Sequence, residues 1–205
     1  MIKRIGLTGG IAAGKSTVAA HLKERGAYLI DYDQLAREVV EPGSEGIHEI
    51  VREFGPDATQ PDGSLNRKWM AAHVFSSGAA PDARQRLDDI EHPLIYRRAK
   101  DLERQVATEK SSSTPVVVHD VPLLAEVIDT IPFRFDHILT VEAPEETRIQ
   151  RMMKTRGMSR EQAEGRIRHQ SSRKQREAIA DVVIDSTQPI EQMFDRLDML
   201  FAQWR

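Results

Sequence analysis

The segment Gly9–Ser16, which reads Gly-Gly-Ile-Ala-Ala-Gly-Lys-Ser, constrains the fold of this chain more than any other feature. It lies between an apolar run, Ile5–Thr8, and a predicted helix, Ser16–Arg25, that ends at Gly26. In this strand–loop–helix context the segment fits the motif G-x-x-x-x-G-K-[ST], whose backbone N–H groups surround phosphate oxygens. We therefore expect a bound nucleoside triphosphate. The alternative is a glycine-rich turn without a ligand.

Two side chains of this loop have expected chemical roles. Lys15 reaches the β- and γ-phosphates in such loops, and the hydroxyl of Ser16 can ligate Mg²⁺, so the loop predicts a nucleoside triphosphate with Mg²⁺. Because backbone N–H groups bind the phosphates, the methyl groups of Ala12 and Ala13 are acceptable if neither position needs a positive φ. The residues expected to bind the nucleotide are Gly9, Gly10, Ile11, Ala12, Ala13, Gly14, Lys15, Ser16 and Thr17.

Short apolar runs alternate with longer helical periods, which predicts an α/β protein with a parallel sheet flanked by helices. Residues 55–66 are rich in turn formers, residues 67–109 have only helical patterns, and residues 110–115 interrupt the chain before the next strand. The predicted strands are Ile5–Thr8, Ala27–Asp31, Val116–His119, His137–Val141 and Val182–Ile184. Besides Ser16–Arg25, helices are predicted from after Asp31 to Val40, from Ile47 to Gly55, and from Pro189 to Trp204.

The composition excludes several classes of protein. A chain of 205 residues with 40% apolar residues can bury one core, and without cysteine it has no disulfide, thiolate metal site or thiol nucleophile. Its longest apolar runs are far shorter than the roughly 20 residues of a membrane helix, and no signal peptide is recognised. A net charge of -3 and an aromatic content of 5% disfavour a nucleic-acid partner. We expect a cytoplasmic protein that binds neither membranes nor nucleic acid.

Acidic residues follow two predicted strands, at the edge where parallel sheets bind ligands. Asp33 could act on an acceptor hydroxyl as a general base or positioning group, or it could cap the helix that follows. Asp120 could lie near Mg²⁺, or it could form the turn before Pro122. His92 is an isolated histidine, and such residues are more often structural or exposed than catalytic. No histidine pair has the spacing of a zinc site.

Positive charge is concentrated between Arg148 and Arg176, which is typical of an anion site. On composition alone a solvated helical face is the more common cause of such a pattern, and the phosphate loop upstream favours the anion site. Arginines of a helical lid neutralise charge on a transferring phosphoryl group. Arg148 and Arg151 lie at i, i+3 on a helix predicted to begin near Pro144, so they can point toward one anion. Nucleic-acid binding is a further alternative, but the segment has no aromatic residue to stack bases. Its basic residues are Arg148, Arg151, Lys154, Arg156, Arg160, Arg166, Arg168, Arg173, Lys174 and Arg176, against two acidic residues, Glu161 and Glu164.

The phosphate loop does not by itself select a reaction. An Asn-Lys-x-Asp guanine signature does not occur, which disfavours a GTPase, and a motor domain fits a chain of this length poorly. The remaining interpretation is a phosphoryl transferase that has its acceptor site on the same chain.

Several motifs, in order along the chain, resemble the dephospho-CoA kinase family. They are Leu7–Ile11, Asp31–Asp33 followed by Ala36 and Arg37, Glu91–Ile95, Asp120–Leu124 with Glu126, the run 151–170, and Ala180–Asp185. The resemblance covers residues 5 to about 188. It implies transfer of the γ-phosphate of ATP to the ribose 3′-hydroxyl of dephospho-CoA, the final step of coenzyme A synthesis.

The resemblance also implies a P-loop nucleotide-kinase fold with a helical acceptor-binding insertion and a helical lid. We expect a nucleotide core at about residues 1–58, 111–143 and 177–205, the insertion at about 59–110, and the basic lid at about 144–176. By position in the family, Asp33 takes or orients the hydroxyl proton, while Lys15 and Arg151 steady the phosphoryl group. The residues implied to line the acceptor or active-site cleft are Thr8, Asp33, Arg37, His92, Asp120, Pro122 and Leu123. Which second lid arginine reaches phosphate is open, because Thr155 stands where a basic residue is usual and Arg156 follows it.

Two other functions are alternatives to the dephospho-CoA kinase activity. A kinase for a nucleoside monophosphate or another small metabolite would share the loop and the lid but differ in its acceptor. A non-catalytic nucleotide sensor, with its basic segment on RNA or a protein partner, would bind nucleotide without turnover. Asp33 and Lys15 together disfavour the sensor.

Overall fold

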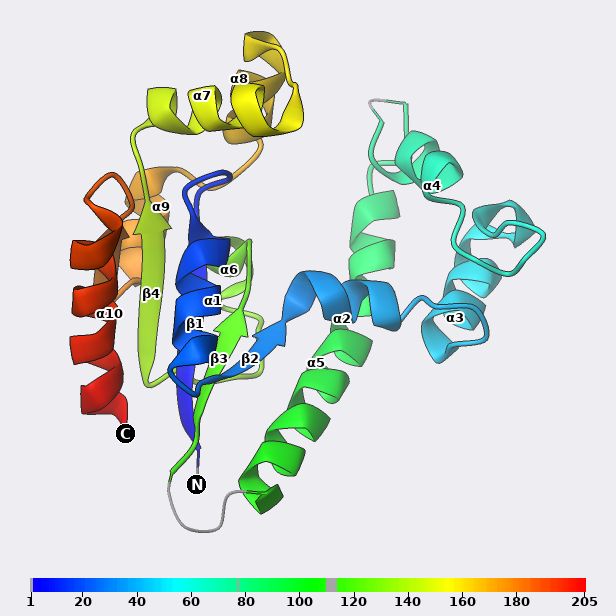
Figure 1. Cartoon of the computed structure of the whole chain (residues 1–205). Helices are drawn as coiled ribbons and strands as arrows, with labels where there is room; N and C mark the ends of the chain where they lie inside the picture. The colour runs from blue at the N-terminus through cyan, green and yellow to red at the C-terminus, as the bar shows by residue number, and fades with distance from the viewer. Residues whose placement is uncertain (1, 77, 110–113) are drawn as a thin grey trace. The chain divides into compact units, whose positions relative to one another are not determined.

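A parallel sheet organises the first of two compact units in the computed structural model of this chain. The structure describes residues 2–76, 78–109 and 114–205. We call the described residues within Met1–Asp31 and Glu103–Arg205 the sheet unit, and Tyr32–Leu102 the helical unit (Figure 1).

The sheet has five strands in the order β2-β3-β1-β4-β5, and every neighbouring pair is parallel. The carboxyl ends of β2, β3 and β1 meet at one edge, since Asp31 is opposite Asp120 and Asp120 is opposite Leu7. The predicted parallel sheet is thereby confirmed, and each predicted strand is present within about two residues at either end. The strands are β1 (Lys3–Gly9), β2 (Tyr28–Asp31), β3 (Val116–Asp120), β4 (His137–Glu142) and β5 (Val182–Asp185).

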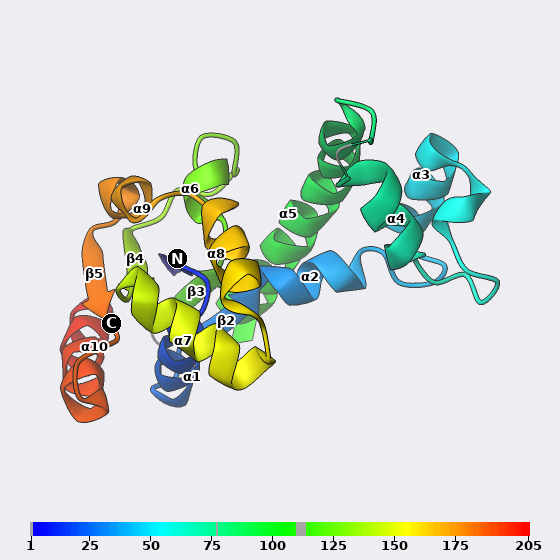
Figure 2. The ribbon, with the colours of Figure 1, turned by 90° about the horizontal axis from the view of Figure 1, so that it is seen from above.

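Helices cover both faces of the sheet (Figure 2). On one face, α1 (Lys15–Glu24) packs against α10 (Ile190–Trp204), and on the other α6 (Leu124–Val127) packs against α9 (Arg173–Ile179). The larger core lies under α1 and α10 because alternate residues of the strands point to that face. Its fully buried members include Ile5, Leu7, Val18, Leu22, Leu139, Ile184 and Leu197. As predicted, α10 follows Pro189 directly.

The predicted lid segment, 144–176, forms helices at the carboxyl end of β4. These are α7 (Glu145–Arg156), α8 (Arg160–Arg168) and the start of α9. Capping boxes begin α8 and α9, where Ser159 pairs with Gln162 and Ser172 with Gln175. Between α7 and α8 the chain turns at Gly157, whose φ is +62°.

The helical unit contains α2 (Tyr32–Glu38), α3 (Glu45–Phe54), the short 3₁₀ helix η1 (Pro56–Ala58), α4 (Arg67–Val74) and most of α5 (Ala83–Glu109). Val40 and Ile50 share one apolar core with residues of η1, α4 and α5, including Ala58, Met70 and Leu87. The unit begins at Tyr32, earlier than the insertion expected at about 59–110. The predicted loop 55–66 contains η1 and a bridge between Thr59 and Leu65.

The helix α5 runs from the helical unit into the sheet unit. There Glu103 accepts hydrogen bonds from Arg4 Nε at 2.6 Å and Arg4 Nη2 at 3.0 Å, and it lies 3.0 Å from His119 Nε2. In the predicted break at 110–115, residues 110–113 lie outside the described residues. Across the described ranges, no helix combines the length and the apolar character needed to cross a membrane.

Candidate active site

The glycine-rich segment forms a loop between β1 and α1, as predicted. A side chain at Gly9 would place its Cβ 2.5 Å from the carbonyl oxygen of Val141, so only glycine lets β1 lie this close to β4. Gly14 has a φ of +104° and is the residue before the first turn of α1. The exposed side chains of Ser16 and Thr17 lie in that first turn. The loop therefore leads directly into a helix N-terminus, the usual arrangement for binding phosphate.

Ala12 is the one residue of the described chain other than glycine with a positive φ, +58°. The expectation that neither alanine would need such a conformation is therefore wrong for Ala12. An L-residue in the left-handed region costs roughly 1–2 kcal/mol because its Cβ approaches the following carbonyl group. Arg151 donates a hydrogen bond to the carbonyl oxygen of this strained residue.

Lys15 is held by the carboxylate at the end of β3. Its Nζ forms a short hydrogen-bonded ion pair with Asp120 Oδ1, and Asp120 is only 6% exposed. Next to this pair, Thr8 donates from Oγ1 to the carbonyl oxygen of Pro122 at 3.3 Å. Leu123 follows as the cap residue of α6. Thr8, Lys15, Asp120, Pro122 and Leu123 thus belong to one edge of the sheet unit.

Arg151, on α7, binds the backbone of the loop. Its Nη1 donates to the carbonyl oxygens of Ala12 at 3.2 Å and Ala13 at 3.1 Å. The same nitrogen lies 3.0 Å from Ser186 Oγ, and Nη2 donates to the Ser186 carbonyl oxygen at 2.9 Å. The predicted catalytic arginine is therefore beside the loop, where both terminal nitrogens of its guanidinium bind protein oxygens.

A second pair of arginines lies against Gly10. A Cβ built at Gly10 would be 2.5 Å from Arg148 Nη1 and 3.0 Å from Arg176 Nη2. Arg176 forms a two-pronged ion pair with Glu142, at 2.6 Å and 2.7 Å, and both partners are at most 2% exposed. Close by, Gln170 Oε1 accepts a hydrogen bond from the Ile11 N–H at 2.8 Å. Side chains of α7, α9 and the segment between α8 and α9 thus contact the loop.

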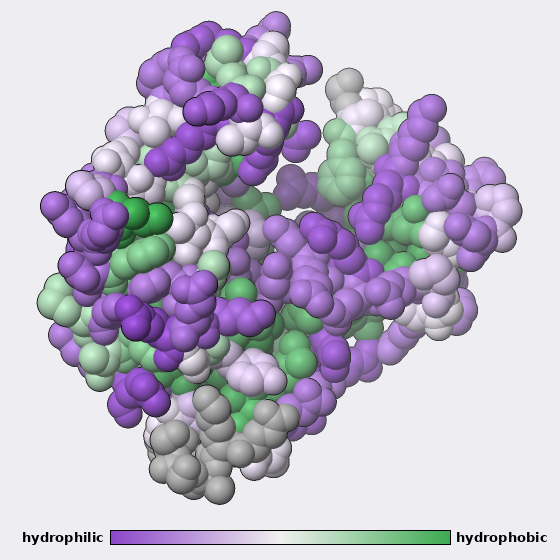
Figure 3. Space-filling model, in the orientation of Figure 1, coloured by the Kyte–Doolittle hydropathy of each residue, from purple (hydrophilic) through white to green (hydrophobic). Residues whose placement is uncertain are grey.

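The positive charge of the basic segment, residues 148–176, is otherwise balanced by acidic side chains within the segment and next to it. Arg160 pairs with Glu146 at 2.6 Å and lowers the pKa of that carboxyl to about 2. Arg173 pairs with Glu177 at 2.6 Å, which raises the pKa of Arg173. The face of α7 and α8 visible in Figure 3 is mainly hydrophilic. Much of the segment is therefore a solvated, ion-paired surface, and the basic side chains described in contact with the loop are those of Arg148, Arg151 and Arg176.

The remaining predicted residues lie in the helical unit. Asp33 and Arg37 are exposed and lie at i, i+4 on α2, and since α2 begins at Tyr32, Asp33 lies within its first turn rather than before it. His92, on α5, is 3.9 Å from Asp88 and contacts the ring of Tyr96. Burial, reinforced by Asp88, raises the pKa of the neighbouring Glu91 to about 7. Glu91 is the first residue of the motif Glu91–Ile95, but no role was predicted for its carboxyl group.

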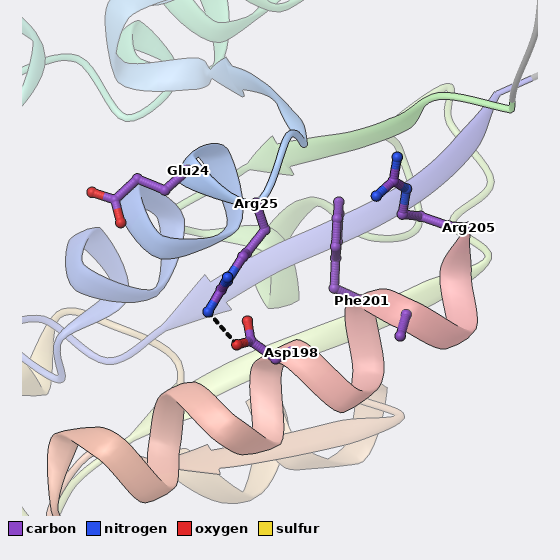
Figure 4. Close-up of a pocket in the computed structure, with 6 residues that line it drawn as sticks. Glu24, Arg25, Asp198, Phe201 and Arg205 are labelled. Carbon is purple, nitrogen blue, oxygen red and sulfur yellow. Dashed lines mark hydrogen bonds and ion pairs between the residues drawn. The ribbon is translucent and has the colours of Figure 1, made fainter.

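A cavity of about 400 Å³ lies in the sheet unit at the C-terminal end of α1. Figure 4 shows Arg25 paired with Asp198 there, beside Phe201 and Arg205. The phosphate loop precedes the other end of α1, so this cavity is not part of the nucleotide site.

The donor set at the loop fits Mg²⁺. A hydroxyl, that of Ser16, and a nearby carboxylate, that of Asp120, are oxygen ligands of the kind Mg²⁺ takes when phosphate oxygens and water complete its shell. These two residues would hold the ion or its water.

Comparison with known proteins now identifies the family. The model of the family described as dephospho-CoA kinase matches residues 3–192. This chain belongs to the dephospho-CoA kinase family. A dephospho-CoA kinase of Bifidobacterium longum is 60% identical over 201 residues, covering 98% of this chain and 96% of the relative.

Solved structures share the fold of this chain. A crystal structure of a Thermus thermophilus protein is 32% identical, with a TM-score of 0.79 and 98% and 97% of the two chains covered. A dephospho-CoA kinase from Campylobacter jejuni is 22% identical, with a TM-score of 0.60 and 98% and 97% covered, which shows the shared fold. The predicted family and P-loop kinase fold are confirmed.

Sequence reasoning missed several residues of this site. Glu142 was not considered because it lies six residues before the basic segment, yet it is the partner of Arg176. An acidic residue at the end of a strand that precedes a basic segment is the signal that could have found it. Ser186 could not be found this way, because its contact with the loop joins residues far apart in the chain.

Proposed function

We propose that this chain transfers the γ-phosphoryl group of ATP to the ribose 3′-hydroxyl of dephospho-CoA, giving coenzyme A and ADP. The observation that carries the proposal is the complete phosphate loop, with Lys15 at the sheet edge, in a chain that belongs to this kinase family from residue 3 to 192. A cytoplasmic location and the absence of nucleic-acid and membrane partners are part of the same proposal.

In this proposal the loop and the start of α1 bind the triphosphate. The N–H groups at the helix N-terminus face the phosphate oxygens, and Lys15 moves from Asp120 toward the β- and γ-phosphates, which offer it more negative charge. Ser16 is the candidate ligand of Mg²⁺, which supplies charge neutralisation when bound. Asp120, at the sheet edge, would help to hold Mg²⁺ there.

The transfer itself forms one bond and breaks one. The acceptor 3′-oxygen bonds to the γ-phosphorus as the bond from that phosphorus to the β-bridging oxygen breaks, and ADP leaves with the electron pair. Asp33 is the candidate group that receives or orients the hydroxyl proton, and its exposed carboxylate leaves it accessible to an acceptor. The candidate acceptor-binding residues are Thr8, Arg37, His92, Pro122 and Leu123.

Coupled ADP release with different acceptors tests the proposal. With ATP and Mg²⁺, we expect dephospho-CoA to raise ADP release sharply, while adenosine monophosphate and shikimate leave it near the background rate. Mass spectrometry should find one phosphate added to the ribose. Equal stimulation by adenosine monophosphate would show a different acceptor, and nucleotide binding without any turnover would favour the sensor.

A further inference from the structure

Arg148 is a buried cation without a counterion of its own. Its side chain lies on α7 within the sheet unit and is 5% exposed. Within the described ranges, neither its Nε nor its Nη1 has a hydrogen-bond partner. A guanidinium in such surroundings loses hydration without replacing it, which is among the most costly arrangements in a protein interior.

The charged groups around Arg148 do not balance it. The carboxylate of Glu142, which raises the pKa of Arg148, directs both oxygens at Arg176 and also accepts a hydrogen bond from Thr140 Oγ1 at 2.8 Å. Two further side chains act in opposite directions, since Glu145 raises the pKa of Arg148 and Arg173 lowers it. Burial first, and then Arg176, lower the pKa of Arg148 overall. The buried cluster of two guanidiniums and one carboxylate therefore keeps an excess positive charge.

This excess charge lies against the phosphate loop. Because Gly10 has no side chain, Arg148 Nη1 reaches to within 2.5 Å of where a Cβ would be. Charges inside a protein are weakly screened, so a buried cation acts strongly on a nearby anion. The anion that such a loop binds is a polyphosphate.

We propose that the phosphates of the bound nucleotide balance the unpaired charge of Arg148, which lies against Gly10. The inference rests on the proposed binding of ATP to the loop. It predicts that Arg148 lowers the stability of the nucleotide-free protein and raises the stability of the complex with nucleotide. A purely structural arginine would stabilise both.

The test compares Arg148→Met with the wild type and with Lys174→Met, which removes the same charge from an exposed position of the same segment. Calorimetry with ATP, inorganic pyrophosphate and adenosine gives the affinities, and thermal unfolding without ligand gives the stability. For Arg148→Met we expect an unchanged or higher melting temperature and affinities for ATP and pyrophosphate lower by about tenfold or more. Adenosine binding should not change.

The dependence of ATP affinity on salt concentration distinguishes the effect of a buried charge from that of a surface charge. The loss caused by Arg148→Met should persist at high salt, whereas any small effect of Lys174→Met should fade. Arg148→Lys keeps the charge and should retain most of the ATP affinity, and Arg148→Gln is a second neutral variant.

Three results would overturn the inference: ATP affinity unchanged in Arg148→Met, adenosine affinity lowered as much as ATP affinity, or both neutral variants less stable than the wild type without ligand. A wild-type protein that does not bind ATP would instead refute the proposed function.

Discussion

Arg151 binds Ser186 through both terminal nitrogens of its guanidinium, with Nη1 3.0 Å from Ser186 Oγ and Nη2 2.9 Å from the carbonyl oxygen. The helix α7 is therefore joined to the segment after β5, and through Ala12 and Ala13 to the phosphate loop. An arginine with this many backbone partners contributes to stability as well as to any catalysis.

Arg151→Ala should consequently have two effects. Losing charge-assisted hydrogen bonds should lower the free energy of unfolding by about 1.5–3 kcal/mol, measured by urea denaturation. If Arg151 also neutralises the transferring phosphoryl group, kcat should fall by roughly 10³–10⁵ with a smaller change in the KM for ATP. Arg151→Lys should recover only part of each loss, because it lacks the planar fork.

Arg156→Ala is the control for this prediction, since Arg156 is exposed on the same helix. It should change stability little. A rise in KM alone for Arg151→Ala would mean that the residue contributes equally to binding in the ground state and the transition state.

Ala12→Gly should stabilise the protein. The substitution removes the strain of a φ of +58°, worth roughly 1–2 kcal/mol, and adds a smaller entropy to the unfolded chain. We expect a net gain of about 0.5–1 kcal/mol in the free energy of unfolding. Ala13→Gly is the matched control, because Ala13 is fully buried and its φ is not positive, so it should be destabilising. A loss of stability in Ala12→Gly would contradict the strain.

Asp33→Asn tests the candidate base. Asp33 is exposed in the first turn of α2, so the substitution should leave the melting temperature nearly unchanged. If the carboxylate serves the acceptor hydroxyl, kcat with dephospho-CoA should fall by roughly 10²–10⁴. The lower end is expected, because the loose transition state of phosphoryl transfer needs little early deprotonation. An unchanged kcat would remove Asp33 from the chemistry.

Glu91 should make stability depend on pH. Burial raises its pKa in the folded state from 4.5 to about 7, so between these values the folded state binds more protons than the unfolded state. Stability should therefore fall as the pH rises from about 4.5 through 7. Glu91→Gln, which is neutral throughout, should melt at a higher temperature than the wild type at pH 8 and lose this part of the pH dependence. The exposed Glu41→Gln is the control and should follow the wild type.

The sequence predicted the strands, the phosphate loop and the last helix because each depends on local patterns. A short apolar run marks β1, and Pro189 marks the start of α10. The conformation of Ala12 was not predictable in this way, since it depends on partners more than a hundred residues later in the chain. The pairing of Arg176 with Glu142 was not predictable either. The charge count covered only residues 148–176, and Glu142 lies before that segment.

The phosphate loop is shaped by its protein contacts before any ligand arrives. Gln170 holds the Ile11 N–H, and Arg151 holds the carbonyl oxygens of Ala12 and Ala13. The conformational entropy of the loop is thereby lost during folding rather than during binding, which is preorganisation in the thermodynamic sense. Nucleotide affinity in this chain consequently depends on residues in its last third, and damage there should weaken binding even where the loop sequence is intact.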